Sequence, residues 1–204
     1  MKKAIQRSVQ VASLLFFILL IFKGRVQLWM LIFASSTLLT LLFSRFYCGW
    51  ICPINTVIRP ISWVKRRLRV KRQKMPTWIE GDIPRNIVLV LFLATMAFVF
   101  KTGKKLPILP ALLGIGALLS ILFDEALWHR HLCPYGTILS FFGRFSKKAM
   151  RIDPNTCTNC LRCVRVCPSN AIVVKDETHT IIKRECLVCH ECERACKAGA
   201  ITYI

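Results

Sequence analysis

The sequence predicts a membrane α-helical part with four transmembrane helices arranged as two duplicated hairpins, followed by a small α+β domain rich in cysteine. Three observations predict this fold class. Four long apolar runs lie in the first 150 residues, Lys and Arg are concentrated between two of these runs, and eight of the eleven cysteines lie between residues 157 and 196. A chain of 204 residues has room for two domains. We expect a four-helix membrane domain over 1–150 and a cytoplasmic domain over 151–204.

The apolar runs cover residues 7–22, 26–43, 85–100 and 106–123. At about 1.5 Å per residue, each crosses or nearly crosses a hydrocarbon layer of about 30 Å. The runs have almost no polar face, which argues against helices buried in a soluble core. Lys2 and Lys3 precede the first run as they would in a signal peptide. No small-residue cleavage site follows, so we expect a retained helix.

The distribution of charge predicts how these helices are oriented. The net charge is +20, and residues 1–150 hold 22 Lys or Arg against 4 Asp or Glu. The cations gather between the second and third runs and after the fourth, whereas the two outer links hold few. The positive-inside rule then gives a multi-pass protein of a bacterial or archaeal cytoplasmic membrane with both termini cytoplasmic. Nucleic acid is not an expected partner, because no recognition motif accompanies the charge.

The membrane part looks like a parallel duplication. One fixed offset carries "YCGWICPIN", residues 47–55, onto "WHRHLCPYG", residues 128–136, and the first two runs onto the last two. Cys52-Pro53 falls on Cys133-Pro134, and Cys48 falls on His129. Basic stretches follow both motifs, and "VIRPISWVKRRLRVKRQK", residues 57–74, is typical of a helix lying in the membrane interface.

Parallel repeats in membranes are usually related by an axis along the membrane normal, which would bring the two motifs together. Four ligands suit a tetrahedral metal or a further iron–sulfur cluster, so we expect a membrane-side site. Its ligands would be Cys48, Cys52, His129 and Cys133. Two alternatives stay open: that Cys-Pro simply ends a helix, since proline stops helices, and that His129 is an interfacial side chain. His131 would point to another face and is the weaker candidate.

Two cysteine runs carry the most specific motif of the chain. Residues 157–168 read "CTNCLRCVRVCP" and residues 186–197 read "CLVCHECERACK", both with the spacing C-x2-C-x2-C-x3-C. Three close cysteines bind one [4Fe–4S] cluster, and the fourth serves the other cluster of the pair. Zinc also binds C-x-x-C pairs, but two complete runs with Pro168 favour iron–sulfur clusters. We expect Cys157, Cys160, Cys163 and Cys196 to bind cluster one, and Cys186, Cys189, Cys192 and Cys167 to bind cluster two.

Short strands should surround the cysteines. "SNAIVV" directly follows the first run and "AGAITY" directly follows the second, and "TIIKR" is a third β-branched piece. The result is a small ferredoxin domain with two clusters. Its apolar core is slight, so the clusters should hold it together and the metal-free domain should be unfolded.

Taken together, these motifs make the chain resemble the membrane-bound polyferredoxin family of NapH type. These are iron–sulfur quinol-dehydrogenase subunits associated with periplasmic nitrate reductase, with relatives in the nitrous oxide reductase regulator and methylamine utilisation proteins. The first family motif matches Cys48, Cys52 and Pro53; the second matches Cys133 and Pro134 but departs at His129. The resemblance implies electron transfer between the quinone pool and redox partners, within a larger complex.

The sequence therefore predicts a membrane-bound electron-transfer subunit of an oxidoreductase complex, and it assigns no catalytic residue. Asp124, Glu125 and His131 are candidates for proton exchange with a quinone, because ionisable groups at the membrane edge are often functional. The alternative for the two acids is that they balance nearby Arg and Lys. A different class of function also stays open: a redox sensor, an assembly factor, a metal-ion reductase, or a plain membrane anchor for the ferredoxin domain.

Overall fold

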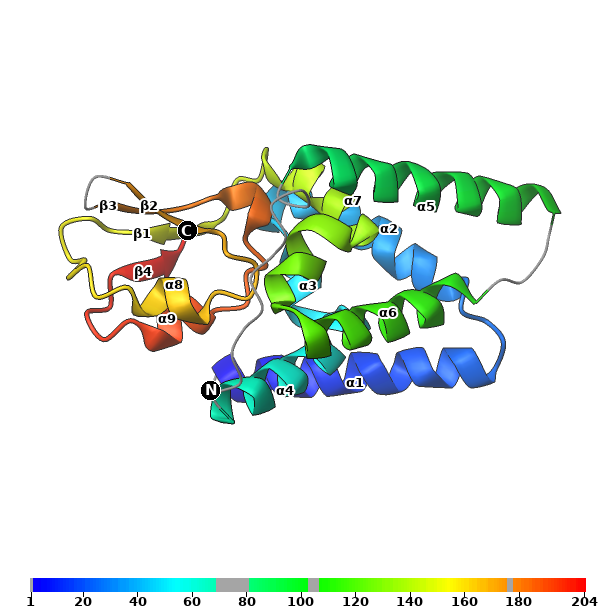
Figure 1. The fold of residues 1–204 in the computed structure, drawn as a ribbon, viewed down its shortest axis with the longest axis horizontal. Helices are drawn as coiled ribbons and strands as arrows, with labels where there is room; N and C mark the ends of the chain where they lie inside the picture. The colour runs from blue at the N-terminus through cyan, green and yellow to red at the C-terminus, as the bar shows by residue number, and fades with distance from the viewer. Residues whose placement is uncertain (1, 69–80, 103–106, 176–177) are drawn as a thin grey trace. The chain divides into compact units, whose positions relative to one another are not determined.

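The computed structural model describes residues 2–68, 81–102, 107–175 and 178–204, and these are mostly helical (Figure 1). The chain divides into two compact units. The first joins Met1–Cys52 to Ile138–Ile204, and the second is Pro53–Thr137. These units divide the chain after Cys52 and after Thr137. They do not test the expected domain boundary at residue 150, which stays a prediction.

In the first unit, the first two apolar runs form helices α1 (Lys2–Phe22) and α2 (Leu28–Phe43), and the short helix α3 (Phe46–Trp50) follows. Gly24 has a φ of 65° in the turn after α1, a left-handed conformation that glycine adopts without steric cost. Phe17 packs edge-on against Trp29, with ring centroids 5.1 Å apart. The Trp29 indole N–H donates to the Tyr47 hydroxyl at 2.8 Å, which fixes α3 beside this helical hairpin.

The second unit holds α4 (Pro53–Arg67), α5 (Asp82–Thr102), α6 (Ile108–Leu122), the π-helical segment η2 (Leu127–Leu132) and the start of α7 (Pro134–Gly143). Within it, α6 packs closely on η2. A Cβ added to Gly116 would lie 2.8 Å from the Trp128 ring and 3.1 Å from Ile54, so only glycine fits there. The predicted interfacial stretch is helical up to Arg67, and its residues 69–74 lie outside the described part of the chain.

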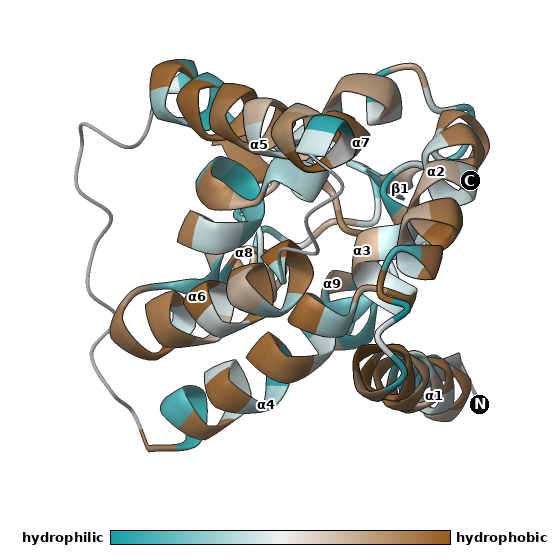
Figure 2. Cartoon of the chain, turned by 90° about the vertical axis from the view of Figure 1, so that its right-hand side faces the viewer, coloured by the Kyte–Doolittle hydropathy of each residue, from teal (hydrophilic) through white to brown (hydrophobic). Residues whose placement is uncertain are grey.

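In the part of the chain that the structure describes, two helices are long and apolar enough to cross a membrane, namely Lys3–Phe22 and Asp82–Val99. Only 22% and 11% of the residues in their apolar windows are buried, whereas the core helix of a soluble protein is mostly buried. In the cartoon of Figure 2, much of the ribbon of α1 and α5 is brown, the colour of hydrophobic residues. Helices α2 and α6 are apolar but shorter, with 16 and 15 residues. Of the four expected spans, two helices therefore have the length that a membrane span needs, and α2 and α6 are shorter.

The cysteine-rich region contains two small antiparallel sheets. Strand β1 (Met150–Ile152) pairs with β4 (Ile201–Tyr203), and β2 (Ile172–Lys175) pairs with β3 (Thr178–Ile181). The strands expected in "SNAIVV" and "AGAITY" are confirmed as β2 and β4. The strand expected in "TIIKR" begins earlier and ends at Ile181, because Lys183–Glu185 forms the 3₁₀ turn η3. Strand β1 has no counterpart in the sequence prediction.

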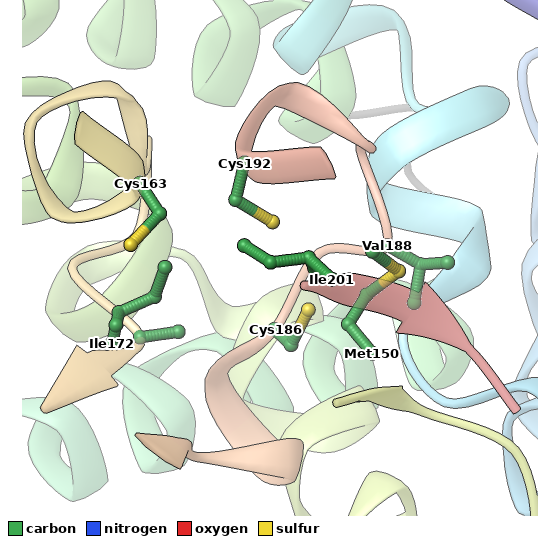
Figure 3. Close-up of a cluster of buried hydrophobic side chains, with 8 residues drawn as sticks. Met150, Cys163, Ile172, Cys186, Val188, Cys192 and Ile201 are labelled. Carbon is green, nitrogen blue, oxygen red and sulfur yellow. The ribbon is translucent and has the colours of Figure 1, made fainter. Parts of the chain in front are cut away.

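Cysteines make up part of the core of this region. Two five-residue helices, α8 (Arg162–Val166) and α9 (Glu191–Ala195), pack against each other beside the strands. Figure 3 shows the buried core, in which the sulfur atoms of Cys186 and Cys192 point toward the same interior space. The core consists of Met150, Cys163, Ala171, Ile172, Cys186, Val188, Cys192 and Ile201. A core this small buries little apolar surface, so bound clusters should contribute much of its stability.

Candidate iron–sulfur sites

The two cysteine runs fold into the same local loop. Asn159 and Leu161 in the first run have φ values of 51° and 58°, and Val188 and His190, at the equivalent positions of the second run, have the same values. A left-handed conformation costs about 1–2 kcal/mol for a residue with a Cβ. The loop accepts this cost twice in each run and thereby turns backbone N–H groups toward sulfur.

Four cysteines from both runs line one pocket, which we call the outer pocket: Cys157, Cys160, Cys163 and Cys196. The pocket has about 320 Å³ of space, including open solvent. Cys160 is exposed, and the backbone N–H of Arg162 donates to its sulfur, which lowers the pKa of this thiol. The outer pocket therefore opens to solvent at its Cys160 edge.

The remaining four cysteines of the two runs line a second pocket, which we call the inner pocket: Cys167, Cys186, Cys189 and Cys192. It has a similar volume of about 320 Å³. The backbone N–H of Ala171 donates to Cys167 Sγ at 3.3 Å, and that of Val188 donates to the Cys186 sulfur. Cys167 of the first run thus lines the inner pocket together with three cysteines of the second run, and Cys196 of the second run lines the outer pocket together with three cysteines of the first. That these two sets bind two clusters stays a prediction.

The cysteines of the inner pocket are more deeply buried than those of the outer pocket. Cys186, Cys189 and Cys192 are all buried. Burial raises the pKa of the Cys186 thiol to about 12, and burial, reinforced by neighbouring thiolates, also raises the pKa of Cys192. A metal binds cysteine as the thiolate, so iron that binds here would release these protons.

Within the first unit, the helices cover the inner pocket. A Cβ added to Gly49 of α3 would lie 2.3 Å from the Leu187 carbonyl oxygen, so glycine permits direct contact between the two backbones. The Trp50 indole N–H donates to the Val188 carbonyl at 3.1 Å. The Gln6 amide of α1 donates to the carbonyls of Gly49 at 3.0 Å and Cys189 at 3.3 Å. These contacts seat the loop that carries Cys186 and Cys189 against the start of α1 and against α3.

A buried ion pair, which sequence reasoning missed, lies at the same place. The Arg45 guanidinium is 0% exposed and contacts the Glu185 carboxylate, 1% exposed, at 3.2 Å. Arg45 belongs to the basic segment between the second and third apolar runs, for which the charge pattern predicts a position at the membrane surface. The position of Glu185 directly before Cys186 is the one signal that could have drawn attention to it.

The expected membrane-side residues are all buried, and each Cys-Pro motif forms the same turn. Cys52 N–H donates to the Tyr47 carbonyl and Cys133 N–H donates to the Trp128 carbonyl, both at 2.9 Å. Both are bonds from residue i to residue i−5, and they fall at equivalent positions of the two motifs, as the duplication requires. Cys48 and Cys52 belong to the first unit, whereas His129 and Cys133 belong to the second. The four-ligand set stays a prediction.

The proton and quinone candidates lie in the second unit. Asp124 and Glu125 line a pocket of about 210 Å³ together with Ser62, Lys65 and Phe123. Glu125 is buried and pairs with Arg66 at 3.5 Å, which favours the alternative that this acid balances a nearby cation. His131 is buried in η2 and does not line this pocket.

Comparisons with known proteins agree with the cysteine motifs. A family model described as a 4Fe-4S binding domain matches residues 25–71 and 106–153, and the starts of these two segments differ by the same offset as Cys52 and Cys133. A model described as a 4Fe-4S dicluster domain matches residues 149–197. No solved structure matches the chain.

Several curated proteins match most of the chain. An uncharacterized protein of Methanocaldococcus jannaschii is 30% identical over 175 residues, which is 82% of this chain and 68% of that protein. The ferredoxin-type protein NapH of Escherichia coli is 27% identical, over 82% of this chain and 66% of its own length. The methylamine utilization ferredoxin-type protein MauN of Methylorubrum extorquens is 26% identical, over 63% of this chain and 49% of its own. The chain thus spans about half to two thirds of the length of these relatives. With these matches, the chain belongs to the NapH-type polyferredoxin family of ferredoxin-type 4Fe-4S electron transport proteins.

Proposed function

We propose that the protein is a membrane-bound electron-transfer subunit that holds two [4Fe–4S] clusters and passes electrons between a redox partner and the quinone pool or a membrane partner subunit. One observation carries this proposal: two separate pockets, each lined by four cysteines drawn from both runs. The ligands would be those of the outer pocket for cluster one and those of the inner pocket for cluster two.

The chemistry of each pocket suits this cofactor. Four cysteine sulfurs are the usual ligand set of a [4Fe–4S] cluster, and backbone N–H groups already donate to Cys160, Cys186 and Cys167. Hydrogen bonds to the sulfurs and exclusion of solvent are the means by which a protein sets the reduction potential. When bound, each cluster supplies one-electron chemistry over a range of about −700 to +450 mV.

Exposed apolar side chains support a membrane position for all four long helices. Leu15 on α1, Leu38 on α2, Val90 on α5 and Leu118 on α6 are each at least 59% exposed. Soluble proteins rarely expose contiguous apolar surface of this kind. At 16 and 15 residues, α2 and α6 would span about 24 Å and about 22 Å. Both are shorter than the hydrocarbon layer of about 30 Å, a mismatch that local thinning of the bilayer can absorb.

Contacts in the first unit support cytoplasmic termini. Gln6, at the start of α1, reaches the Cys189 carbonyl, and the Tyr203 hydroxyl of β4 donates to the Phe43 carbonyl at the end of α2 at 3.1 Å. The start of α1 and the end of α2 thus contact the cysteine-rich region, which must lie on one side of any membrane that the hairpin crosses. The positive-inside rule puts that side in the cytoplasm.

The two pockets suggest the order of the relay. The outer pocket has the exposed Cys160 at its edge, so a soluble partner can approach it. The inner pocket lies against Gly49 and Trp50 of α3, next to the first Cys-Pro motif. Electrons would therefore pass between a partner and the membrane through the outer pocket first and the inner pocket second. Cys48, Cys52, His129 and Cys133 remain the candidates for a further site at the membrane edge.

The test begins with anaerobic purification of the full chain in detergent, followed by iron and sulfide counts and reduction by a menaquinol analogue. About eight irons per chain correspond to two clusters, and more would indicate a loaded membrane-side site. Iron counts of His129→Ala and Cys133→Ala then show whether His129 is a ligand. Loss of the extra iron in both variants would make His129 a ligand, and loss in Cys133→Ala alone would show that it is not. A chain with eight irons that exchanges no electrons with quinols or with a soluble donor would instead favour a sensor or an anchor, and a chain without iron would contradict the proposal.

Orientation needs a separate test. Single-cysteine labelling is unsuitable because the chain has eleven cysteines, so a protease site inserted after Ile204 is the better probe. In inverted membrane vesicles the site should be cut, and in intact spheroplasts it should be protected. Cleavage in spheroplasts would contradict a cytoplasmic C-terminus.

A further inference from the structure

A buried cluster of charges stands beside the inner pocket. Arg45 Nη1 lies 3.2 Å from Glu185 Oε2 and also donates to the Arg184 carbonyl at 3.4 Å. The Arg45 Nη2 atom lies 3.9 Å from Cys48 Sγ. Glu185 is bonded directly to Cys186, a cysteine of the inner pocket. The guanidinium is therefore placed between the first Cys-Pro motif and the inner pocket.

The charges at this place differ in burial. The Glu185 carboxylate meets two guanidinium groups, Arg45 at 3.2 Å and Arg184 at 3.5 Å, and accepts a hydrogen bond from the Ser140 hydroxyl at 3.3 Å. Arg184 is 46% exposed and screened by water, whereas Arg45 and Glu185 are fully buried. Buried charges act over a lower effective dielectric, so Arg45 and Glu185 should each act on the inner pocket more strongly than Arg184 does.

We propose that the buried Arg45–Glu185 pair tunes the reduction potential of the inner cluster, with Arg45 raising this potential and Glu185 lowering it. This inference rests on the proposed function, because it requires clusters in both pockets. Reduction adds one negative charge to a cluster, and a fixed positive charge nearby favours the reduced form. Glu185 holds Arg45 in place and opposes part of its charge, so both are positioning residues that touch no substrate.

The consequence concerns an electron shared between the two clusters. The field of Arg45 moves the equilibrium toward a reduced inner cluster, and the field of Glu185 moves it toward a reduced outer cluster. An arginine suits this role because its guanidinium stays charged even when it is buried.

The test is an anaerobic redox titration of the purified full chain, followed by electron paramagnetic resonance. The inner signal is assigned by its loss in Cys192→Ser. Glu185→Gln should raise the inner potential and Arg45→Gln should lower it, each changing the equilibrium between the clusters by roughly tenfold, about 59 mV for one electron. The outer potential should stay where it is in both variants. Arg45→Lys keeps the charge and should stay closer to the unmodified protein than Arg45→Gln.

Matched variants keep the test decisive. Arg184→Gln removes a cation that contacts the same carboxylate from an exposed position, and it should shift the inner potential far less than Arg45→Gln. If Arg45→Gln fails to assemble clusters because it leaves a buried carboxylate, Glu185→Gln and Arg45→Lys still carry the test. Three results would overturn the inference. The two clusters could shift in potential by equal amounts, Arg45→Gln and Glu185→Gln could shift the inner potential in the same direction, or neither variant could shift it. Absence of iron in the unmodified chain would instead overturn the proposed function.

Discussion

Gly49→Ala tests whether the cysteine-rich region depends on its contact with α3. The added Cβ would lie 2.3 Å from the Leu187 carbonyl oxygen and 3.0 Å from that of Val188. Both atoms belong to the backbone, so no side-chain rotation relieves the clash. The Leu187 oxygen must retreat by about 1 Å to reach an ordinary contact of 3.4 Å, and the loop that carries Cys186 and Cys189 must move with it.

The cost follows from what the movement breaks. Overpacking costs about 1–3 kcal/mol. The hydrogen bond from Trp50 to the Val188 carbonyl and the one from Gln6 to the Cys189 carbonyl would stretch, and each is worth about 0.5–1.5 kcal/mol. We expect a loss of about 2–5 kcal/mol, a large part of the about 5–15 kcal/mol that stabilises a folded protein. At about 2–4 °C per kcal/mol for a chain of this size, the midpoint should fall by roughly 5–15 °C.

The assay is thermal bleaching of cluster absorbance in anaerobic detergent solution. Gly114→Ala is the matched control, because a Cβ at Gly114 meets nothing within 4 Å and lies in helix α6. Alanine at that position should be neutral or stabilising by about 0.5–1 kcal/mol. If Gly49→Ala bleaches at the same temperature as Gly114→Ala, the contact between α3 and the inner pocket contributes no stability and the reasoning fails.

Three further predictions concern the two units separately. Cys160→Ser and Cys192→Ser should each reduce the iron count from about eight to about four and remove different paramagnetic signals; loss of the same signal in both would refute the grouping of the cysteines. Removal of iron by a chelator should make residues 150–204 sensitive to protease while helical circular dichroism largely persists, because metal and folding are coupled in such a small core; full resistance without iron would contradict this. Gly116→Ala places a Cβ 2.8 Å from the Trp128 ring and should destabilise the second unit by about 1–3 kcal/mol. The reduction potentials of the clusters should not change, and a change in either potential would contradict this prediction.

The shared local loop of the two cysteine runs could be predicted, because a repeated spacing carries its own geometry. The two runs share one spacing, and the same φ values recur at Asn159 and Val188 and at Leu161 and His190. Strands β2 and β4 followed from β-branched residues at equivalent positions after the two runs. Strand β1 was not predicted, because three residues, Met150–Ile152, give no periodicity and become a strand only by pairing with β4.

The ion pair could not be predicted from local pattern. Arg45 and Glu185 are far apart in the sequence, and nothing around Arg45 distinguishes it from the other cations of the basic segment. Charge counting assumes that such residues lie at the membrane surface. Arg45 is instead fully buried, because the close approach at Gly49 seals this side of the cysteine-rich region against α3.

The two copies of the duplication differ at the residues that make this contact in the first unit. Both copies keep the same turn, with Cys52 N–H bonded to the Tyr47 carbonyl and Cys133 N–H bonded to that of Trp128. The offset that carries Cys52 onto Cys133, however, replaces Arg45, Cys48 and Gly49 with Ala126, His129 and Arg130. An arginine in place of Gly49 would carry the Cβ that the Leu187 carbonyl excludes, and an alanine in place of Arg45 would supply no charge. The shared turn is therefore a property of the repeat, whereas the close backbone contact and the buried cation follow from residues that the second copy does not have.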